Sequence, residues 1–310
     1  MSTHPFQNST VLRLFAISIV AVGAVSAQEK DAIRWAELFA NHYLFQPDIV
    51  YGVANNIELR LDVWERQNTK SPVSTVIYIY GGGWVFGGKA GADTLLMPYL
   101  QKGWNAVNVE YRMAGQSLAP AAVQDSRCAL RWVFRNSGKY HFDTKRLIVM
   151  GHSAGGHLAL ITGMLPPDTD FDDNCAADPA SGDVRLHVSA IVNWYGITDV
   201  ANLLSGVNRK TYAIAWLGRQ PGSLQLARRL SPLTYVQRDL PPVITIHGDH
   251  DPTVPYSQAV RLHQALDSAG VPNKLVTIRG GAHGNFSDTQ TENSYKQIWE
   301  FLDAHVNGLE

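Results

Sequence analysis

Residues 147–157 read Leu-Ile-Val-Met-Gly-His-Ser-Ala-Gly-Gly-His, an apolar run that leads into a Gly-X-Ser-X-Gly motif. The apolar run predicts a buried strand, and the residues after the motif follow a helical pattern. Gly151 and Gly155 lack Cβ atoms, so the chain can turn sharply between the strand and the helix. Such a turn exposes the Ser153 hydroxyl at the carboxyl edge of a sheet and aims the Ala154 N–H at the same place. A plain strand-to-helix turn is the alternative, which this context disfavours.

The rest of the chain alternates short runs rich in Val, Ile and Tyr with longer segments of helical period, which is the pattern of βαβ units. We predict an antiparallel edge strand over Leu59–Trp64. Continuous buried strands are predicted over Val76–Tyr80, Ala106–Tyr111, Leu147–Gly151, Ala190–Tyr195, Val243–His247 and Lys274–Ile278. Helices are predicted over Asp31–Tyr43, Ala121–Phe134, Ser153–Leu165, Ser257–Ala269 and Glu292–Val306. The predicted fold class is α/β, with a mostly parallel central sheet of about eight strands and helices on both faces.

The N-terminus has the pattern of a secretory leader. Residues 11–25 are apolar apart from Arg13 and Ser18, and the small residues that follow suit cleavage after Ala27. A run of about 15 residues is too short to span a bilayer, and an uncleaved anchor or a buried helix is the alternative. We predict a signal peptide over residues 1–27, export to the periplasm or the cell exterior, and no stable membrane association after cleavage.

No repeat, charge block or low-complexity linker divides residues 28–310, which we predict to form a single domain with two insertions. Residues 166–183 are rich in Asp, Pro and Gly and predict a solvated loop. Residues 198–232 predict a helical excursion between two strands. Such an excursion is where a lid or a substrate wall would form.

Charge and cysteine content narrow the class of protein. Lys and Arg total 26 against 27 Asp and Glu, so no excess of positive charge exists to hold a nucleic acid. Two cysteines are too few for a disulfide scaffold, but in an oxidising compartment Cys128 and Cys175 could form one bridge that pins the first insertion. Buried free thiols are the alternative.

A nucleophilic serine needs a base and a carboxylate that orients the base, and both should follow the serine along the chain. After the strand Val243–His247 comes a Gly-Asp-His-Asp-Pro-Thr-Val-Pro run with two carboxylates. We assign the acid to Asp251, which precedes the rigid Pro-Thr-Val-Pro turn, and expect Asp249 to cap that turn. His283 follows the strand Lys274–Ile278 in a glycine-rich loop and is the predicted base.

A tetrahedral intermediate also needs N–H donors aimed at its oxyanion, and glycine backbone supplies them without side-chain obstruction. Residues 80–84 read Tyr-Gly-Gly-Gly-Trp and follow a predicted strand. We predict an oxyanion hole formed by the N–H groups of Gly82, Gly83 and Ala154. A flexible turn is the alternative, and a phosphate loop is disfavoured because no Lys-Ser or Lys-Thr pair ends the run.

Several aromatic and histidine side chains near these motifs are predicted to have roles outside the triad and the oxyanion hole. Trp84, Tyr212 and Trp216 are predicted to shape the substrate pocket. His247 and His250 read as a core and a turn residue. The histidines show no metal-ligand spacing, so neither a metal nor a cofactor is predicted.

Two carboxylates raise the alternative of a glycosidase, which uses such pairs. These are Glu110 and Asp125, and each lies where a structural salt bridge is the simpler explanation. The expected partners are Arg112 and Arg127.

The combined motifs resemble the α/β-hydrolase superfamily, and within it the esterases similar to hormone-sensitive lipase and to bacterial carbohydrate side-chain (acetyl or feruloyl) esterases. The resemblance rests on four segments, residues 81–84, 151–156, 247–255 and 283–284. It covers nearly all of the predicted domain and implies the same triad and the same oxyanion donors.

Two departures from the family pattern bear on the site. The family's His-Gly-Gly-Gly has Tyr80 in place of the histidine, which removes any hydrogen bond by which that histidine holds the loop, and we expect activity to be tuned rather than lost. The stretch Gln28–Val50 is too short for the large cap of lipase-like members. The resemblance therefore implies a minimal cap and an open, shallow site suited to small acyl groups or bulky exposed esters.

These features predict an exported serine carboxylic ester hydrolase that acts through an acyl-enzyme on short-chain, aryl or sugar esters. A peptidase or amidase of the same fold and a non-catalytic binding protein on this scaffold are the alternatives. The expected partner is a small-molecule or polymer-borne ester. The sequence leaves open whether that ester is a polysaccharide side chain, a lipid, a polyester or a xenobiotic, and it leaves the oligomeric state open.

Overall fold

The computed structural model describes residues 37, 41–167, 169–173, 175 and 186–306. The chain divides into two compact units, Met1–Asn41 and His42–Glu310, and the second carries the sheet and the candidate site. The predicted signal peptide and most of the predicted N-terminal helix lie outside the described residues.

Eight strands form the sheet. They are β1 (Tyr43–Ala54), β2 (Ile57–Arg66), β3 (Val73–Ile79), β4 (Asn105–Val109), β5 (Phe142–His152), β6 (Ala190–Trp194), β7 (Val243–Gly248) and β8 (Asn273–Ile278). Their order across the sheet is β1-β2-β4-β3-β5-β6-β7-β8. β2 pairs antiparallel with β1 and β4, and every other neighbouring pair is parallel. The predicted mostly parallel sheet is confirmed.

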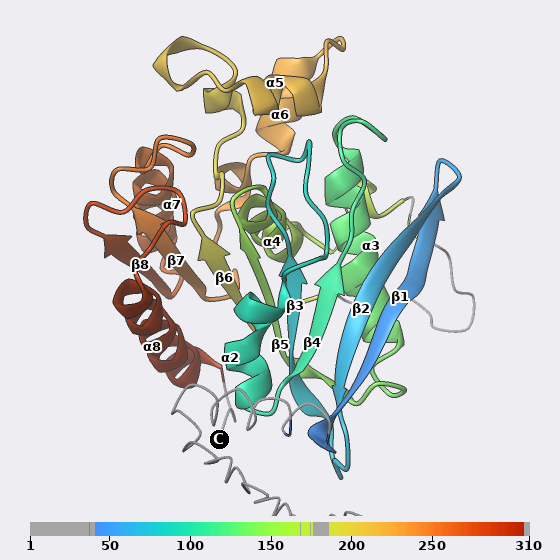
Figure 1. The fold of residues 1–310 in the computed structure, drawn as a ribbon. Coiled ribbons are helices and arrows are strands. Elements are labelled where there is room, and N and C mark those ends of the chain that lie inside the picture. The colour runs from blue at the N-terminus through green and yellow to red at the C-terminus, as the bar shows by residue number, and fades with distance from the viewer. Residues whose placement is uncertain (1–36, 38–40, 168, 174, 176–185, 307–310) are drawn as a thin grey trace, which may run out of the picture. The chain divides into compact units, whose positions relative to one another are not determined.

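Helices cover both faces of this sheet. They are α2 (Asp93–Gln101), α3 (Ala121–Arg135), α4 (Ala154–Met164), α5 (Thr211–Leu217), α6 (Ser223–Arg229), α7 (Ser257–Ala269) and α8 (Asp288–His305). Figure 1 shows α2 and α8 on one face and α3, α4 and α7 on the other. The short α5 and α6 lie beyond the carboxyl ends of the central strands (Figure 1).

The central strands are continuous apolar runs because both of their faces are covered. β4, β6 and β7 are buried over their whole length, and β3 is buried apart from Val73. The two helices on the first face also contact each other, since the Tyr295 hydroxyl of α8 donates to the Leu95 carbonyl of α2 at 3.1 Å. The core therefore forms two layers around a rigid sheet whose carboxyl edge can position a site.

Two elements differ from the sequence predictions. The strand predicted as an edge, Leu59–Trp64, lies inside β2, which pairs on both sides, and β1 forms the edge instead. Bulges interrupt the pairing of β1, so its residues lack the regular alternation that marks a strand. α2 contains Pro98, and a proline normally argues against a helix interior.

A disulfide joins Cys128 of α3 to Cys175. Close by, the Asp172 carboxylate accepts hydrogen bonds from Arg127 at 2.6 Å and from Arg131 at 3.1 Å. Both arginines belong to α3, so covalent and ionic contacts together attach this part of the first insertion to that helix. The sequence left open whether the two cysteines form a disulfide or remain free thiols, and the structure has the disulfide.

Candidate active site

The turn between β5 and α4 presents Ser153. Its backbone has φ 55° and ψ −123°, a strained conformation for a residue with a side chain. A Cβ on Gly151 would lie 2.2 Å from the Gly155 carbonyl oxygen, and a Cβ on Gly155 would lie 2.0 Å from that of Ile79. Only glycine fits at these two positions, which explains why the motif can hold its serine on so tight a turn.

The three residues predicted as a triad form one hydrogen-bonded chain. His283 Nε2 lies 2.8 Å from Ser153 Oγ, and His283 Nδ1 lies 2.7 Å from Asp251 Oδ2. Ser153 is 8% exposed, whereas the Asp251 side chain is fully buried. The imidazole can therefore accept the serine proton on one nitrogen while the carboxylate holds the other.

Both carboxylate oxygens of Asp251 are held by hydrogen-bond partners. Oδ1 accepts the N–H groups of Thr253 and Val254 at 2.8 and 2.9 Å, and Oδ2 lies 3.2 Å from His247 Nε2. Burial alone would raise the pKa of Asp251, but the hydrogen bonds from His247 and His283 outweigh it and hold that pKa well below its usual range. The carboxylate stays ionised beside the base.

Asp249 does not cap the Pro-Thr-Val-Pro turn, which corrects the sequence expectation. Its Oδ1 accepts the Gly280 N–H at 2.6 Å. This hydrogen bond joins the loop after β7 that carries Asp251 (the acid loop) to the loop after β8 that carries His283 (the base loop). Asp251 caps the turn itself, because its own side chain reaches two and three residues ahead. The preference for Asp251 as the triad acid agrees with this geometry.

The loop after β3 carries backbone donors next to the serine. Gly82 and Gly83 have φ values of +117° and +59°, and a Cβ on Gly82 would lie 1.9 Å from the Phe86 carbonyl oxygen. In the part of the chain that the structure describes, the N–H groups of Gly82, Gly83 and Ala154 donate to no protein acceptor. β3 and β5 are neighbours in the sheet, so their carboxyl ends bring these donors to the same edge. This arrangement suits an oxyanion hole.

Two tyrosines and a histidine hold this loop. The Tyr111 hydroxyl donates to the carbonyl of Tyr80 at 3.1 Å, and the two rings stack with centroids 4.5 Å apart. The Gly81 N–H donates to His152 Nε2 at 3.2 Å. The substitution of Tyr80 for the family's histidine therefore leaves the loop tied on both its carbonyl and its N–H side.

Trp84 and Trp216 do not line the pocket, contrary to the sequence expectation. Both are 0% exposed, and their rings stack at 4.1 Å between centroids. The His157 ring meets both indoles edge-on, at 4.9 and 5.5 Å. The stack joins α5, α4 and the loop after β3 that carries Gly82 and Gly83 (the oxyanion loop) into one packed unit. These aromatic side chains therefore support the site as part of the core.

Tyr212 is the predicted pocket residue that stays partly exposed. Its hydroxyl donates to the Thr253 carbonyl at 3.1 Å, and Lys210 Nζ donates to the Pro252 carbonyl at 2.6 Å. A Cβ on Gly83 would lie 3.0 Å from Tyr212 Cβ. The start of α5 thus contacts the acid loop and the oxyanion loop together.

Tyr195 is a site residue that the sequence reading missed. Its backbone has φ 40°, and its ring lies 4.7 Å from the His283 ring in an edge contact. Burial, followed by the negative charge of Asp251, raises its pKa to about 12. Tyr195, His152 and His247 each lie at or just beyond the carboxyl end of a parallel strand, and that shared position is the signal that could have marked them.

The two carboxylates that raised the glycosidase alternative, Asp125 and Glu110, differ in their partners. Asp125 accepts from Arg112 at 2.7 Å in a buried salt bridge, as predicted, while Arg127 pairs with Asp172 instead. The salt bridge expected for Glu110 is wrong within the described residues, because Glu110 forms no ion pair there, and burial raises its pKa. No group of three His, Cys, Asp or Glu side chains in that same part of the chain could hold a metal ion.

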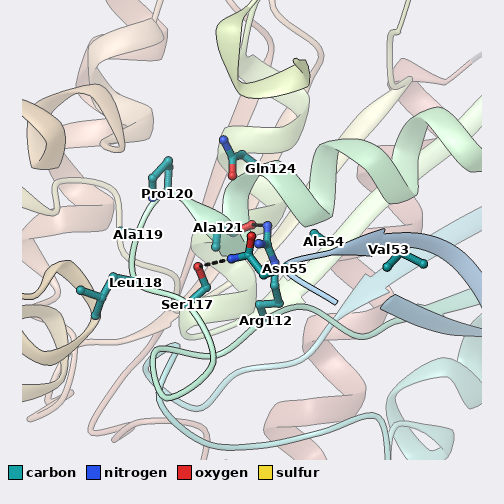
Figure 2. A pocket seen from close by; sticks show the side chains of 10 residues that line it. All are labelled: Val53, Ala54, Asn55, Arg112, Ser117, Leu118, Ala119, Pro120, Ala121 and Gln124. Atoms are coloured by element: carbon teal, nitrogen blue, oxygen red, sulfur yellow. Dashed lines mark hydrogen bonds between the residues drawn. The ribbon is translucent and has the colours of Figure 1, made fainter. Parts of the chain in front are cut away.

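A cavity of about 570 Å³ lies at the start of α3 (Figure 2). Arg112, Gln124 and Leu118 are among its lining residues, and the Asn55 amide donates to the Ser117 hydroxyl at 3.5 Å. No triad or oxyanion-loop residue lines it, so it is separate from the site described above.

Within the described residues, no helix has both the length and the apolar character needed to cross a membrane.

Comparison with known proteins gives a consistent result. The BD-FAE family model matches residues 61–266. The chain is 28% identical over 244 residues to the probable carboxylic ester hydrolase LipM of Mycobacterium tuberculosis, and 29% identical over 258 residues to the esterase LipQ of the same organism. These alignments cover 76% and 80% of this chain but only 55% and 58% of those proteins, so the chain spans little more than half of their length.

Solved structures share the fold. A truncated carbohydrate esterase from gut microbiota has a TM-score of 0.72 and 26% identity, covering 84% of this chain and 96% of that one. A bifunctional GH43-CE protein of Bacteroides eggerthii has a TM-score of 0.74 and 28% identity, covering 85% of this chain and 38% of that one. Esterase 2 of Thermogutta terrifontis, phosphoramylated by tabun, has a TM-score of 0.68 and 25% identity, covering 84% and 94%. The predicted α/β-hydrolase fold is confirmed.

Proposed function

The chain belongs to the BD-FAE family, and from that premise we propose that it is a serine hydrolase of carboxylic esters that acts through an acyl-enzyme on Ser153. The observation that carries the proposal is the continuous Asp251–His283–Ser153 hydrogen-bond chain at the carboxyl edge of the sheet. Esterase relatives and a complete triad both favour catalysis over a binding role on the same scaffold.

In the first half-reaction Ser153 Oγ attacks the ester carbonyl carbon while His283 Nε2 takes its proton. The carbonyl oxygen gains negative charge and receives the N–H groups of Gly82, Gly83 and Ala154. Collapse of this intermediate breaks the bond to the leaving alcohol, which takes the proton from His283. The product is an acyl ester on Ser153.

In the second half-reaction a water molecule replaces the alcohol. His283 takes a proton from the water, whose oxygen attacks the acyl carbon, and then returns the proton to Ser153 Oγ as the carboxylic acid leaves. Asp251 remains ionised throughout and stabilises the imidazolium that forms in each half.

The substrates that we propose are short-chain, aryl or sugar esters. Support comes from the solved structure described as a carbohydrate esterase. Phe86, in the loop that carries the oxyanion donors, is 67% exposed and offers an aromatic surface on that loop. Tyr212 offers a second, half-buried ring.

Hydrolysis by wild-type protein and Ser153→Ala tests the function. On an activated acetyl ester and a feruloyl ester, the variant should lose at least about 10³-fold in kcat. Ser268→Ala, on the exposed side of α7, is the matched control and should retain activity. Equal ester rates for wild type and Ser153→Ala contradict the mechanism, and faster cleavage of an aminoacyl anilide than of any ester favours a peptidase or amidase instead.

We also propose that residues 1–27 are a signal peptide and that the mature chain is exported, without stable membrane association or a nucleic-acid partner. The disulfide between Cys128 and Cys175 supports an oxidising compartment. Expression of the full chain in a bacterial host, followed by intact mass measurement of the exported fraction, should find Gln28 as the first residue. Recovery of the uncleaved chain from the cytoplasmic fraction alone contradicts export.

A further inference from the structure

His152, the residue before the nucleophile, contacts the oxyanion loop through its ring. Nε2 lies 3.2 Å from the Gly81 nitrogen, and Nδ1 lies 2.7 Å from the Tyr78 hydroxyl. A Cβ on Gly81 would lie 2.8 Å from both Cδ2 and Nε2 of this ring. The imidazole is therefore packed directly on the first glycine of the loop, with a polar partner at each nitrogen.

These two contacts fix the protonation state of the ring. The Gly81 N–H can only donate, so Nε2 must be the unprotonated acceptor. The single proton of the neutral imidazole then sits on Nδ1 and is donated to the Tyr78 hydroxyl oxygen. A protonated ring would direct a second N–H at the Gly81 N–H and would lose this hydrogen bond.

We propose that neutral His152 is a positioning residue that holds the oxyanion loop through Gly81, and that its protonation releases the loop and slows the reaction. The proposal rests on the proposed ester hydrolysis. The ring supplies a hydrogen bond to this loop in a chain that carries Tyr80 where the His-Gly-Gly-Gly pattern of the esterases it resembles has histidine. Because Gly82 and Gly83 follow directly, a change in the backbone at Gly81 is transmitted to the two donors.

The surroundings favour the neutral ring. Burial, and then the positive charge that His283 can carry, lower the pKa of His152 to about 4. Three titratable side chains face it from other elements: Tyr78 of β3, Tyr195 after β6 and His283 after β8. Burial raises the pKa of Tyr78 well above its usual range, so that partner stays an uncharged phenol. No carboxylate among these neighbours would stabilise a charged imidazole.

Two substitutions separate the hydrogen bond from the titration. His152→Gln can place an amide oxygen near the position of Nε2 and does not titrate, whereas His152→Leu offers no acceptor. At pH 7 we expect kcat to fall by about 10- to 100-fold in His152→Leu, somewhat less than the loss of a whole oxyanion donor, with KM changed by less than about threefold. His152→Gln should recover most of this loss. His263→Gln is the control, since His263 is another buried histidine but lies on α7 and bonds Asn273.

The pH profile gives a readout that a purely structural role would not move. Catalysis needs His283 unprotonated and is slowed when His152 is protonated, so log kcat of the wild type should fall more steeply near pH 4 than that of His152→Gln, by up to the loss of about 10- to 100-fold expected in His152→Leu. Equal slopes in the two proteins overturn the proposal, as does a His152→Leu variant that folds and keeps the wild-type kcat.

Imidazole ¹⁵N NMR tests the proposal without any reaction. The signal pair that disappears in His152→Gln should show a protonated Nδ1 and an unprotonated Nε2 at pH 7, and should titrate near pH 4. A protonated Nε2 at pH 7, or titration near the ordinary histidine value of about 6.5, overturns it. Ser153→Ala should keep this signature, so failure of the proposed ester hydrolysis and failure of the His152 role are distinguishable.

Discussion

Asp251 receives hydrogen bonds on both carboxylate oxygens inside the protein. His283 donates at 2.7 Å and the Thr253 and Val254 N–H groups at 2.8 and 2.9 Å, while His247 Nε2 lies at 3.2 Å. A buried carboxylate in this setting keeps its charge and fixes the His283 tautomer that leaves Nε2 free to accept a proton.

Replacing Asp251 with Asn keeps the shape and removes the charge. We expect kcat to fall by about 10⁴-fold at pH 7, with a much smaller change in KM, because the amide no longer fixes the imidazole tautomer. Steady-state kinetics on an activated acetyl ester measure this effect. Asp249→Asn is the control, since Asp249 binds the Gly280 N–H and not the base, and comparable losses in both variants contradict the assignment.

His157 should make the stability of the fold depend on pH. It is fully buried and donates to the Leu230 carbonyl at 2.6 Å, and burial lowers its pKa from 6.5 to about 4. The unfolded chain binds the proton first as pH falls, so the stabilisation is complete above pH 6.5 and is lost on the way to pH 4. The loss is of order 3 kcal/mol.

Urea unfolding at pH 7, 5.5 and 4 measures this dependence. His157→Gln can still donate to the Leu230 carbonyl but cannot titrate, so its free energy of unfolding should be lower at pH 7 and should vary less with pH. The same pH dependence in the variant and the wild type contradicts the role of His157.

The sequence predicted the triad residues because each follows an apolar run and belongs to a short motif with its own chemical reason. His152 and His247 lie within these motifs, but at positions for which the motifs give no chemical role. A lone histidine at the end of a buried strand looks like any core residue, and its partners, Gly81 for one and Asp251 for the other, are set by the fold. The prediction that Trp84 shapes the pocket was wrong for a related reason, because its position in the motif does not reveal which way the ring points.

Among the secondary-structure elements, α5 contacts two of the loops that form the site. Its Trp216 stacks on Trp84, which directly follows the oxyanion glycines, and both indoles are fully buried. The start of the same helix contacts the acid loop through Tyr212. A seven-residue helix thus supports both the acid loop and the oxyanion loop.

Trp216→Ala should therefore impair both stability and catalysis. We expect a loss of about 3–5 kcal/mol in the free energy of unfolding, from the cavity left by the indole, and a fall in kcat as the oxyanion loop loosens. Urea unfolding and ester kinetics on the same sample measure the two effects. Leu224→Ala, at an exposed position of α6, should change neither, and a fully active, fully stable Trp216→Ala contradicts the coupling.

The disulfide is expected to contribute to stability rather than to catalysis. It links residues 47 apart, so the double variant Cys128→Ser, Cys175→Ser should lose about 2–4 kcal/mol of unfolding free energy. Its kcat at 25 °C should stay within about twofold of the wild type, since neither cysteine contacts the triad. Unchanged stability in urea contradicts the structural role of the bond.

Helices and strands were predictable where a single period dominates. α7 begins and ends at the predicted residues, and the central strands follow their continuous apolar runs. β1 and α2 were missed, because bulges break the period of the first and a proline interrupts the second. β1 is defined by its pairing with β2, which depends on the neighbouring strand as well as on its own residues.

The fold of residues 42–310 brings together residues that lie far apart in sequence. Ser153 and His283 are separated by 130 positions, yet the order β5-β6-β7-β8 places the ends of their strands along one sheet edge. Parallel strands share that edge, so the topology alone predicts which loops meet. The register of the strands and the stack behind the loop then set distances of hydrogen-bond length.

Covalent capture of Ser153 gives the sharpest test of this account. After treatment with an excess of an aryl alkylphosphonate, wild-type protein should gain one phosphonyl mass, which peptide mapping should place on Ser153, with parallel loss of ester hydrolysis. Ser153→Ala should remain unlabelled, and His283→Ala should label far more slowly. A stable phosphonyl group on a residue other than Ser153, or full ester hydrolysis by protein labelled on Ser153, contradicts the account.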